Sequence, residues 1–244
     1  MEEHLLAKNN PTDSKAYFAF MADQKSKEKE LEIKAKQLRT KRNLQIWNDK
    51  YPDYKDLSLS NFKSNYYNLT VPPLSNNMLR TPSFMVTSKS AKLRDAFVNS
   101  VIKACLAQGI ITPSEVEFTT AADGAAHING MFASRSWKDR IFNQKNKVIV
   151  IEDTNADPYQ INEKDNTRFW GTITNFCEVN EIALIISYRP KSTNKLSINA
   201  GGPSKSVIYP VTTDVKSDIH LYGRLKMGFI DFTGLKREDV FNEN

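Results

Sequence analysis

The segment with the clearest chemical content is an apolar, β-branched run, Val148 to Ile151, that is followed by two acids, Glu152 and Asp153. A continuous apolar run of this kind indicates a strand that is buried on both faces. In open α/β sheets, ligands bind just beyond the carboxyl ends of the strands, so paired acids at this place predict a metal-phosphate site. The alternative is that the acids cap the turn over residues 153–155.

A second candidate segment lies upstream, between an expected strand over residues 83–87 and a helix whose apolar residues recur at one-face spacing over 97–106. It supplies the residues that we expect to surround a nucleotide: Ser88, Lys89, Lys92, Arg94 and Asp95. Residues 88–95 have the length of a phosphate-binding loop but contain no glycine, since all nine glycines lie at Gly109 or later. Fitted to the pattern G-x-x-x-x-G-K-[ST], Arg94 takes the lysine position and Asp95 the magnesium-binding hydroxyl. An acid there repels a phosphate, so we expect a degenerate site, at which binding of ATP and Mg²⁺ is doubtful.

The N-terminal part predicts a long basic helix. From about Ser14 to Asp49 there is no Pro or Gly, and the apolar residues Leu31, Leu38 and Ile46 form only a narrow seam. One interpretation is a solvated helix with ion pairs. The other is an arm that docks on a partner or contacts nucleic-acid phosphates, through Lys34, Lys36, Arg39, Lys41 and Arg42.

Residues 47–79 interleave aromatic side chains with lysines. Such a segment can stack on unpaired bases, or its rings can pack on the neighbouring domain. The turn-rich stretch 71–77 marks a boundary. We therefore expect a basic helical arm and linker over residues 1–79 and an α/β domain over residues 80–244.

Beyond residue 80 the order β-α-β-α-β-α-β predicts the fold class α/β, with a mainly parallel sheet flanked by helices. Further strands are expected over residues 115–119, 181–188, 207–209 and 229–232, and further helices within 123–142, around 169–177 and over 218–226. A polar, basic loop follows the strand over 181–188. We expect it to give a second set of nucleic-acid contacts, Arg189, Lys191, Lys195 and Lys205.

Composition limits the classes of function. The formal net charge of +6 favours nucleic acid or another acidic partner. The sequence has neither a transmembrane run nor the apolar core of a signal peptide, so no membrane partner is expected. Cys105 and Cys177 are predicted to be reduced core thiols of a cytoplasmic protein. The three histidines are too scattered to indicate a metal site.

The order and spacing of these parts resemble the AAA+ ATPases of the bacterial DnaC/DnaI-type helicase loaders and the related IstB-type ATPases, over roughly residues 57–236. Residues 57–62 resemble the family's entry motif, 83–97 its Walker A strand and loop, 148–153 its Walker B strand and 182–188 its sensor 1 strand. Residues 221–226 resemble its closing helix, with Arg224 at the arginine finger. The chain departs from the family in lacking both Walker A glycines, the lysine and the hydroxyl, and its Walker B acids are Glu-Asp instead of Asp-Glu.

The resemblance implies a P-loop-NTPase-like accessory protein of DNA replication in a bacterium, mobile element or phage. It would bind single-stranded DNA and a replicative helicase or other replication protein, without a working ATPase, and its assembly into a homo-oligomer stays open. Residues 186–190 also resemble the sensor region of FtsK/HerA-type translocases and viral packaging ATPases, which would make the chain an active enzyme. A third interpretation is a non-catalytic interaction protein that retains the sheet.

Overall fold

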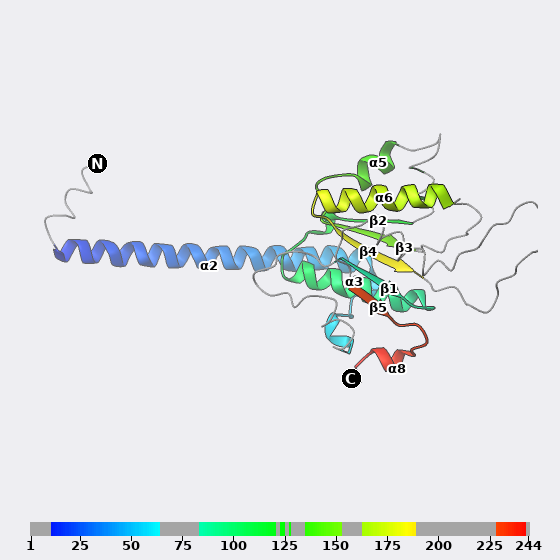
Figure 1. Ribbon diagram of the computed structural model, residues 1–244. Helices are drawn as coiled ribbons and strands as arrows, with labels where there is room; N and C mark the ends of the chain where they lie inside the picture. Colours follow the sequence, from blue (N-terminus) through cyan, green and yellow to red (C-terminus); the bar gives the residue numbers. More distant parts are fainter. Residues whose placement is uncertain are drawn as a thin grey trace, which may run out of the picture.

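The centre of the protein is a five-stranded, all-parallel sheet (Figure 1). The computed structural model describes residues 11–63, 83–120, 123–124, 127, 135–152, 163–188 and 228–242. The strands are β1 (Phe84–Thr87), β2 (Val116–Thr120), β3 (Val148–Glu152), β4 (Ala183–Tyr188) and β5 (Gly228–Asp231), in the order β2-β3-β4-β1-β5. The predicted fold class is therefore confirmed. The strand and helix expected over 207–209 and 218–226 lie outside the described residues.

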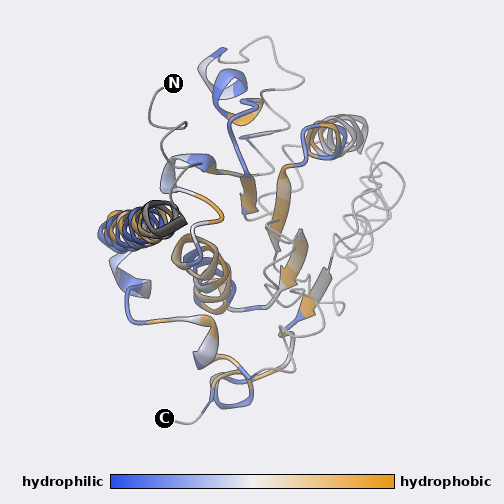
Figure 2. Cartoon of the chain, turned by 90° about the vertical axis from the view of Figure 1, so that its left-hand side faces the viewer, coloured by the Kyte–Doolittle hydropathy of each residue, from blue (hydrophilic) through white to orange (hydrophobic). Residues whose placement is uncertain are grey.

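Helices cover both faces of the sheet. The α-helices are α2 (Pro11–Lys50), α3 (Ala91–Ala107), α5 (Arg135–Ile141), α6 (Glu163–Val179) and α8 (Arg237–Val240). Three short 3-10 helices are η1 (Pro52–Tyr54), η2 (Leu59–Asn61) and η4 (Pro113–Glu115). Seen along α2, the layers run from α2 to α3, then the sheet, then α6 (Figure 2). None of the helices among the described residues is long and apolar enough to cross a membrane.

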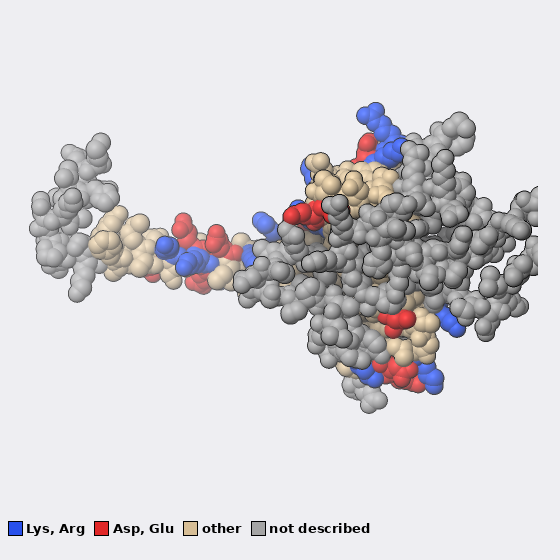
Figure 3. All heavy atoms as spheres, in the orientation of Figure 1, with Lys and Arg blue, Asp and Glu red and all other residues tan. Residues whose placement is uncertain are grey.

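The N-terminal part of α2 projects from the body as an arm (Figure 1), and we use this name for residues 11–42. Every side chain over residues 16–39 is exposed, so none of them is buried against the described part of the body. Acidic and basic side chains alternate along it (Figure 3). Lys27 pairs with Asp23 and Lys34 with Glu30, both at 2.7 Å and at i,i+4 spacing. Each such pair stabilises a helix by about 0.2–0.5 kcal/mol.

The C-terminal part of α2 packs against α3 through a face that does not include the apolar seam. The expected seam is exposed: Leu31 at 66%, Leu38 at 71% and Ile46 at 45%. The side chains that pack are Leu44 and the fully buried Trp47, whose Nε1 donates a 3.1 Å hydrogen bond to Oδ1 of Asn99 on α3. The sequence does not indicate which of the two sets is buried, because both recur at helical spacing. Only the position of α3 decides which set is buried.

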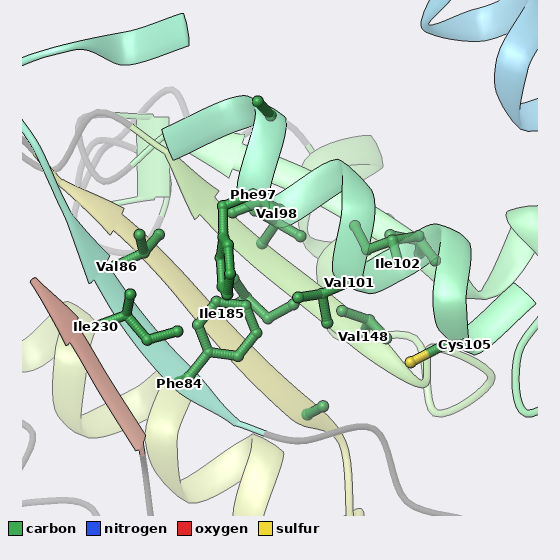
Figure 4. Packing of buried hydrophobic residues seen from close by; sticks show 14 of the residues in the cluster. Phe84, Val86, Phe97, Val98, Val101, Ile102, Cys105, Val148, Ile185 and Ile230 are labelled. Carbon is green, nitrogen blue, oxygen red and sulfur yellow. The ribbon is translucent and has the colours of Figure 1, made fainter. Parts of the chain in front are cut away.

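The core has two layers because successive residues of a strand point to opposite faces. On one face α3 contributes Phe97, Val101 and Ile102, which meet Phe84 of β1 and Ile185 of β4 (Figure 4). On the other face α5 and α6 cover alternate strand residues, and the cluster consists of Met85, Trp137, Ile141, Ile149, Ile151, Phe169, Trp170, Ile173, Cys177, Ile182, Leu184 and Ile186. Cys105 and Cys177 are buried in the core, as expected, and do not form a disulfide with each other.

The connector after α2 packs on the body. Trp47 and Phe62 are 1% and 0% exposed, so their rings belong to the core and do not offer a stacking surface. Lys103 of α3 holds the connector by donating hydrogen bonds to three of its carbonyl oxygens, at 3.1, 2.5 and 2.6 Å. Of the two interpretations of this aromatic segment, the burial of these two residues supports packing of the rings on the neighbouring domain.

The C-terminal segment clasps the same connector. The amide of Lys63 donates to the carbonyl of Val240 at 2.9 Å, and the amide of Asn242 donates to the carbonyl of Asn61 at 2.8 Å. The side chain of Asn242 donates two more bonds, to the carbonyls of Ser60 and Phe62. We refer to these contacts between residues 60–63 and 238–242 as the terminal clasp. It fixes the position at which the chain enters the α/β domain.

Candidate nucleotide and nucleic-acid site

The loop that follows β1 is much shorter than the sequence suggested. Helix α3 begins at Ala91, which leaves only residues 88–90 between strand and helix. Ser90 caps the helix, because its Oγ accepts a 3.3 Å hydrogen bond from the amide of Leu93. The amide of Ser90 in turn donates to Oγ of Ser88 at 3.1 Å. The expectation of an eight-residue loop over 88–95 was therefore wrong, since Ser at the cap position started the helix early.

Arg94 is the residue that the sequence placed at the phosphate-binding lysine, and it is directed into the protein. It is 2% exposed. Its Nε donates to Oγ of Ser187 at 3.1 Å, and its Nη1 donates to the carbonyl oxygen of Ser88 at 2.5 Å. The guanidinium thus joins the end of β1, the start of α3 and the end of β4. Lys89 and Lys92, the other two basic residues of this set, are exposed.

The acids of the site are only partly within the described chain. Glu152 ends β3, is half-buried, and is in register with Thr120 of β2. Asp153 lies outside the described residues, as do Arg224 and the basic loop residues Arg189, Lys191, Lys195 and Lys205. Asp95 is half-buried in the second turn of α3. The structure therefore brings Ser88, Arg94 and Ser187 into contact.

Two tyrosines of the connector contribute to the electrostatics of this edge, and the sequence did not predict it. Burial raises the pKa of Tyr51 to about 12, and the charges of Glu152 and Glu117 add to the shift. Burial also raises the pKa of Tyr54, with smaller contributions from Asp95, Asp53 and Glu152. The end of α2 and η1 therefore lie near the carboxyl ends of the strands. No local pattern signals this, because the contact joins residues about 100 positions apart.

The described residues do not fit a bound ATP with Mg²⁺. A phosphate cradle needs a loop of free backbone N–H groups at a helix N-terminus. Here two of the relevant amides, of Ser90 and Leu93, donate to serine hydroxyls of the same loop. The cation that would face a phosphate, Arg94, already donates to protein oxygens at two of its nitrogens. We therefore derive no chemical step through a nucleotide.

The basic residues of the arm form a separate surface. All five, Lys34, Lys36, Arg39, Lys41 and Arg42, are exposed. Lys36 lies beside Gly109, just after the C-terminal end of α3. Lys89 precedes the other end of this helix, and 17 residues of α-helix span about 25 Å. Lys36 and the loop after β1 therefore lie at opposite ends of α3.

Comparisons with known proteins give a similarity to solved structures alone. No family model matches the sequence, and no curated protein matches it. Among solved structures, one described as the DnaC helicase loader aligns with a TM-score of 0.39 and 13% identity, over 64% of this chain and 82% of that one. Values of this size are too low to transfer a function.

Proposed function

We propose that this protein is a DNA-replication accessory factor of the helicase-loader type that acts by binding and does not hydrolyse ATP. The observation that carries the proposal is Arg94. It lies at the carboxyl edge of a parallel sheet, where ligands of such folds bind, yet its guanidinium is 2% exposed and bonded to Ser88 and Ser187. Because this guanidinium is buried and hydrogen-bonded to protein oxygens, it is poorly placed to bind a phosphate, which supports a degenerate nucleotide site.

The arm supports binding of nucleic acid. Five cations lie within nine residues of α2, and none of residues 34–42 is acidic. Their exposure leaves them accessible to phosphates, whose binding releases counterions and is independent of base sequence. Single-stranded DNA is the substrate that we propose, with the loop over 189–205 as a second contact.

The tip of the arm supports a protein partner. Tyr17, Phe18, Phe20 and Met21 are 48%, 69%, 58% and 48% exposed. Large apolar side chains that cluster on an unpacked helix commonly mark a surface that docks into a groove of another protein. We propose that this partner is a replication protein such as a replicative helicase, which would place the α/β domain next to the DNA on which the partner acts.

The first test addresses the nucleotide. We expect isothermal titration calorimetry of the full chain with ATP and Mg²⁺ to show no binding in the micromolar range, because the amides and the cation of the site are occupied by protein groups. The variants Glu152→Gln and Asp153→Asn serve as controls for specificity. Micromolar binding that both substitutions abolish would contradict the degenerate site and favour the active-ATPase interpretation.

The second test addresses nucleic acid. We expect fluorescence anisotropy with a labelled single-stranded oligonucleotide to show binding that weakens steeply with salt, with a slope of about −0.7 per neutralised phosphate. Reversal of the arm charges at Lys34, Arg39 and Arg42 to Glu should lower the affinity regardless of base sequence. The matched control reverses Arg135, Lys138 and Lys145, which are exposed residues of α5 and the turn that follows it, on the other side of the sheet from α2.

If the unmodified protein does not bind the oligonucleotide at low salt, DNA handling is excluded and the interaction-protein interpretation replaces it. Equal losses in the arm variant and in the control variant would show that only the net charge matters, and that the arm is not a specific contact surface.

A further inference from the structure

A groove lies where the arm meets the body. It has a volume of about 460 Å³ and is formed by one face of α2 and the end of α3. Its apolar surface comes from Ile33, Leu44 and Ala107, and two cations, Lys36 and Lys41, stand beside them. Ile33 is 57% exposed, so more than half of its surface is left uncovered. The residues of the candidate nucleotide site do not line this groove, but Lys36 and Lys41 are also among the five cations that we propose to contact nucleic acid.

The groove has a defined shape because α3 ends against α2 at this point. Gly109 follows the helix with a φ of +68°, a conformation that glycine adopts without strain. Its amide donates to the carbonyl of Leu106 at 3.0 Å. A Cβ at Gly109 would lie 3.6 Å from Cε of Lys36 and 3.8 Å from Oγ1 of Thr40, so the turn passes directly beside α2. The negative end of the α3 dipole also favours a cation here.

The chemistry of the lining selects one class of occupant. The groove contains two lysines and no acid, so it attracts carboxylates. Its floor is aliphatic and holds no aromatic ring, which is the group that unpaired bases need for stacking. An apolar side chain can fill the floor while flanking carboxylates pair with the two ammonium groups. We infer that this groove docks an acidic peptide segment of a partner protein, anchored by an aliphatic side chain.

The test uses a short fluorescein-labelled peptide in which aspartates flank a pair of leucines, titrated against the full chain by anisotropy. We expect saturable binding. The double variant Lys36→Glu with Lys41→Glu should weaken it by about tenfold or more, which corresponds to about 1.4 kcal/mol. The matched control is Lys25→Glu with Lys27→Glu, the same charge change on the same helix but six or more residues before the first groove residue, Ile33, and should alter the affinity less than twofold.

A second variant separates the groove from general electrostatics. Ala107→Phe fills the apolar floor without changing the charge, and Ala107 is exposed, so the helix tolerates the larger side chain. We expect this variant to lose at least tenfold in peptide affinity and to keep its affinity for single-stranded DNA. Urea unfolding verifies that the variant is folded.

Three results would overturn the inference. The first is that the labelled peptide does not bind at low salt. The second is that a peptide with serines in place of the leucines binds equally well, which would reduce the groove to a cationic surface. The third is that Ala107→Phe weakens DNA binding as much as peptide binding, which would assign the groove to nucleic acid. The proposed function is tested by different measurements, namely the affinity for ATP and the arm-dependent binding of DNA. Neither is expected to change in Ala107→Phe, so a failure of the proposed function can be distinguished from a failure of this inference.

Discussion

Replacing Phe62 by Ala is expected to lower the free energy of unfolding by about 3–5 kcal/mol, the largest effect of any single substitution that we predict. Phe62 is 0% exposed, and its ring lies 5.1 Å from that of Phe97 and 4.5 Å from that of Phe241. Truncation leaves a cavity that the terminal clasp cannot close, because its backbone hydrogen bonds fix the surrounding chain. The measurement is urea denaturation followed by tryptophan fluorescence.

The matched control is Phe18→Ala on the arm. The same side chain is removed there, but Phe18 is 69% exposed, so the stability should change by no more than about 0.5 kcal/mol. Equal losses at the two positions would mean that Phe62 does not occupy the core. Since a change in the slope of the transition would signal altered compactness, the midpoint and the slope are both compared.

Replacing Arg94 by Met is expected to lower the free energy of unfolding by about 3 kcal/mol. The aliphatic stem is retained, but two hydrogen bonds from a charged donor are lost, and the carbonyl of Ser88 and the hydroxyl of Ser187 lose a buried partner. Lys should not rescue the protein, because a single ammonium cannot reproduce the forked geometry of a guanidinium. The measurement is again the free energy of unfolding in urea, with Lys92→Met as the exposed control on the same helix.

This experiment also separates two roles of Arg94. If the guanidinium were kept for an anionic ligand, it would be a destabilising buried charge in the free protein, and Arg94→Met would leave the stability unchanged or raise it. In that case phosphate or ATP would raise the unfolding midpoint of the unmodified protein but not of the variant. Under our proposal neither anion shifts the midpoint.

The sheet could be predicted from the sequence because its signals are local. The apolar runs that became β3 and β4 are continuous over several residues, as expected of strands covered on both faces. The helical spacing of Phe97, Val101 and Cys105 likewise identified α3. The burial of both cysteines followed from the same patterns.

The start of α3 was within reach of the sequence but was missed. Ser90 is a favoured helix cap, and the residues after it contain no glycine or proline that would hold a loop open. The Walker A pattern, fitted to residues 88–95, predicts a longer loop than the one that ends at this cap.

Other features could not have been found from local patterns. Both faces of α2 carry apolar side chains, so the burial of Trp47 and not of Leu38 depends on where α3 lies. The hydrogen bonds from Lys103 to the connector and from Asn242 to residues 60–62 join distant positions. Tyr51 near Glu152 is a contact of the same kind. These contacts depend on the folded structure and produce no periodic pattern in the sequence.

The terminal clasp has a consequence for the order in which this protein can be completed on the ribosome. Domains generally fold as units during synthesis, and the arm emerges long before its domain is finished. Strand β5 and the partners of Asn61 and Lys63 are synthesised long after β1 and the connector that they contact. Until they emerge, Phe62 lacks the ring of Phe241 and β1 lacks one neighbour. A nascent chain paused before residue 228 would therefore expose an open sheet edge beside a finished arm, and would be the form most in need of a chaperone.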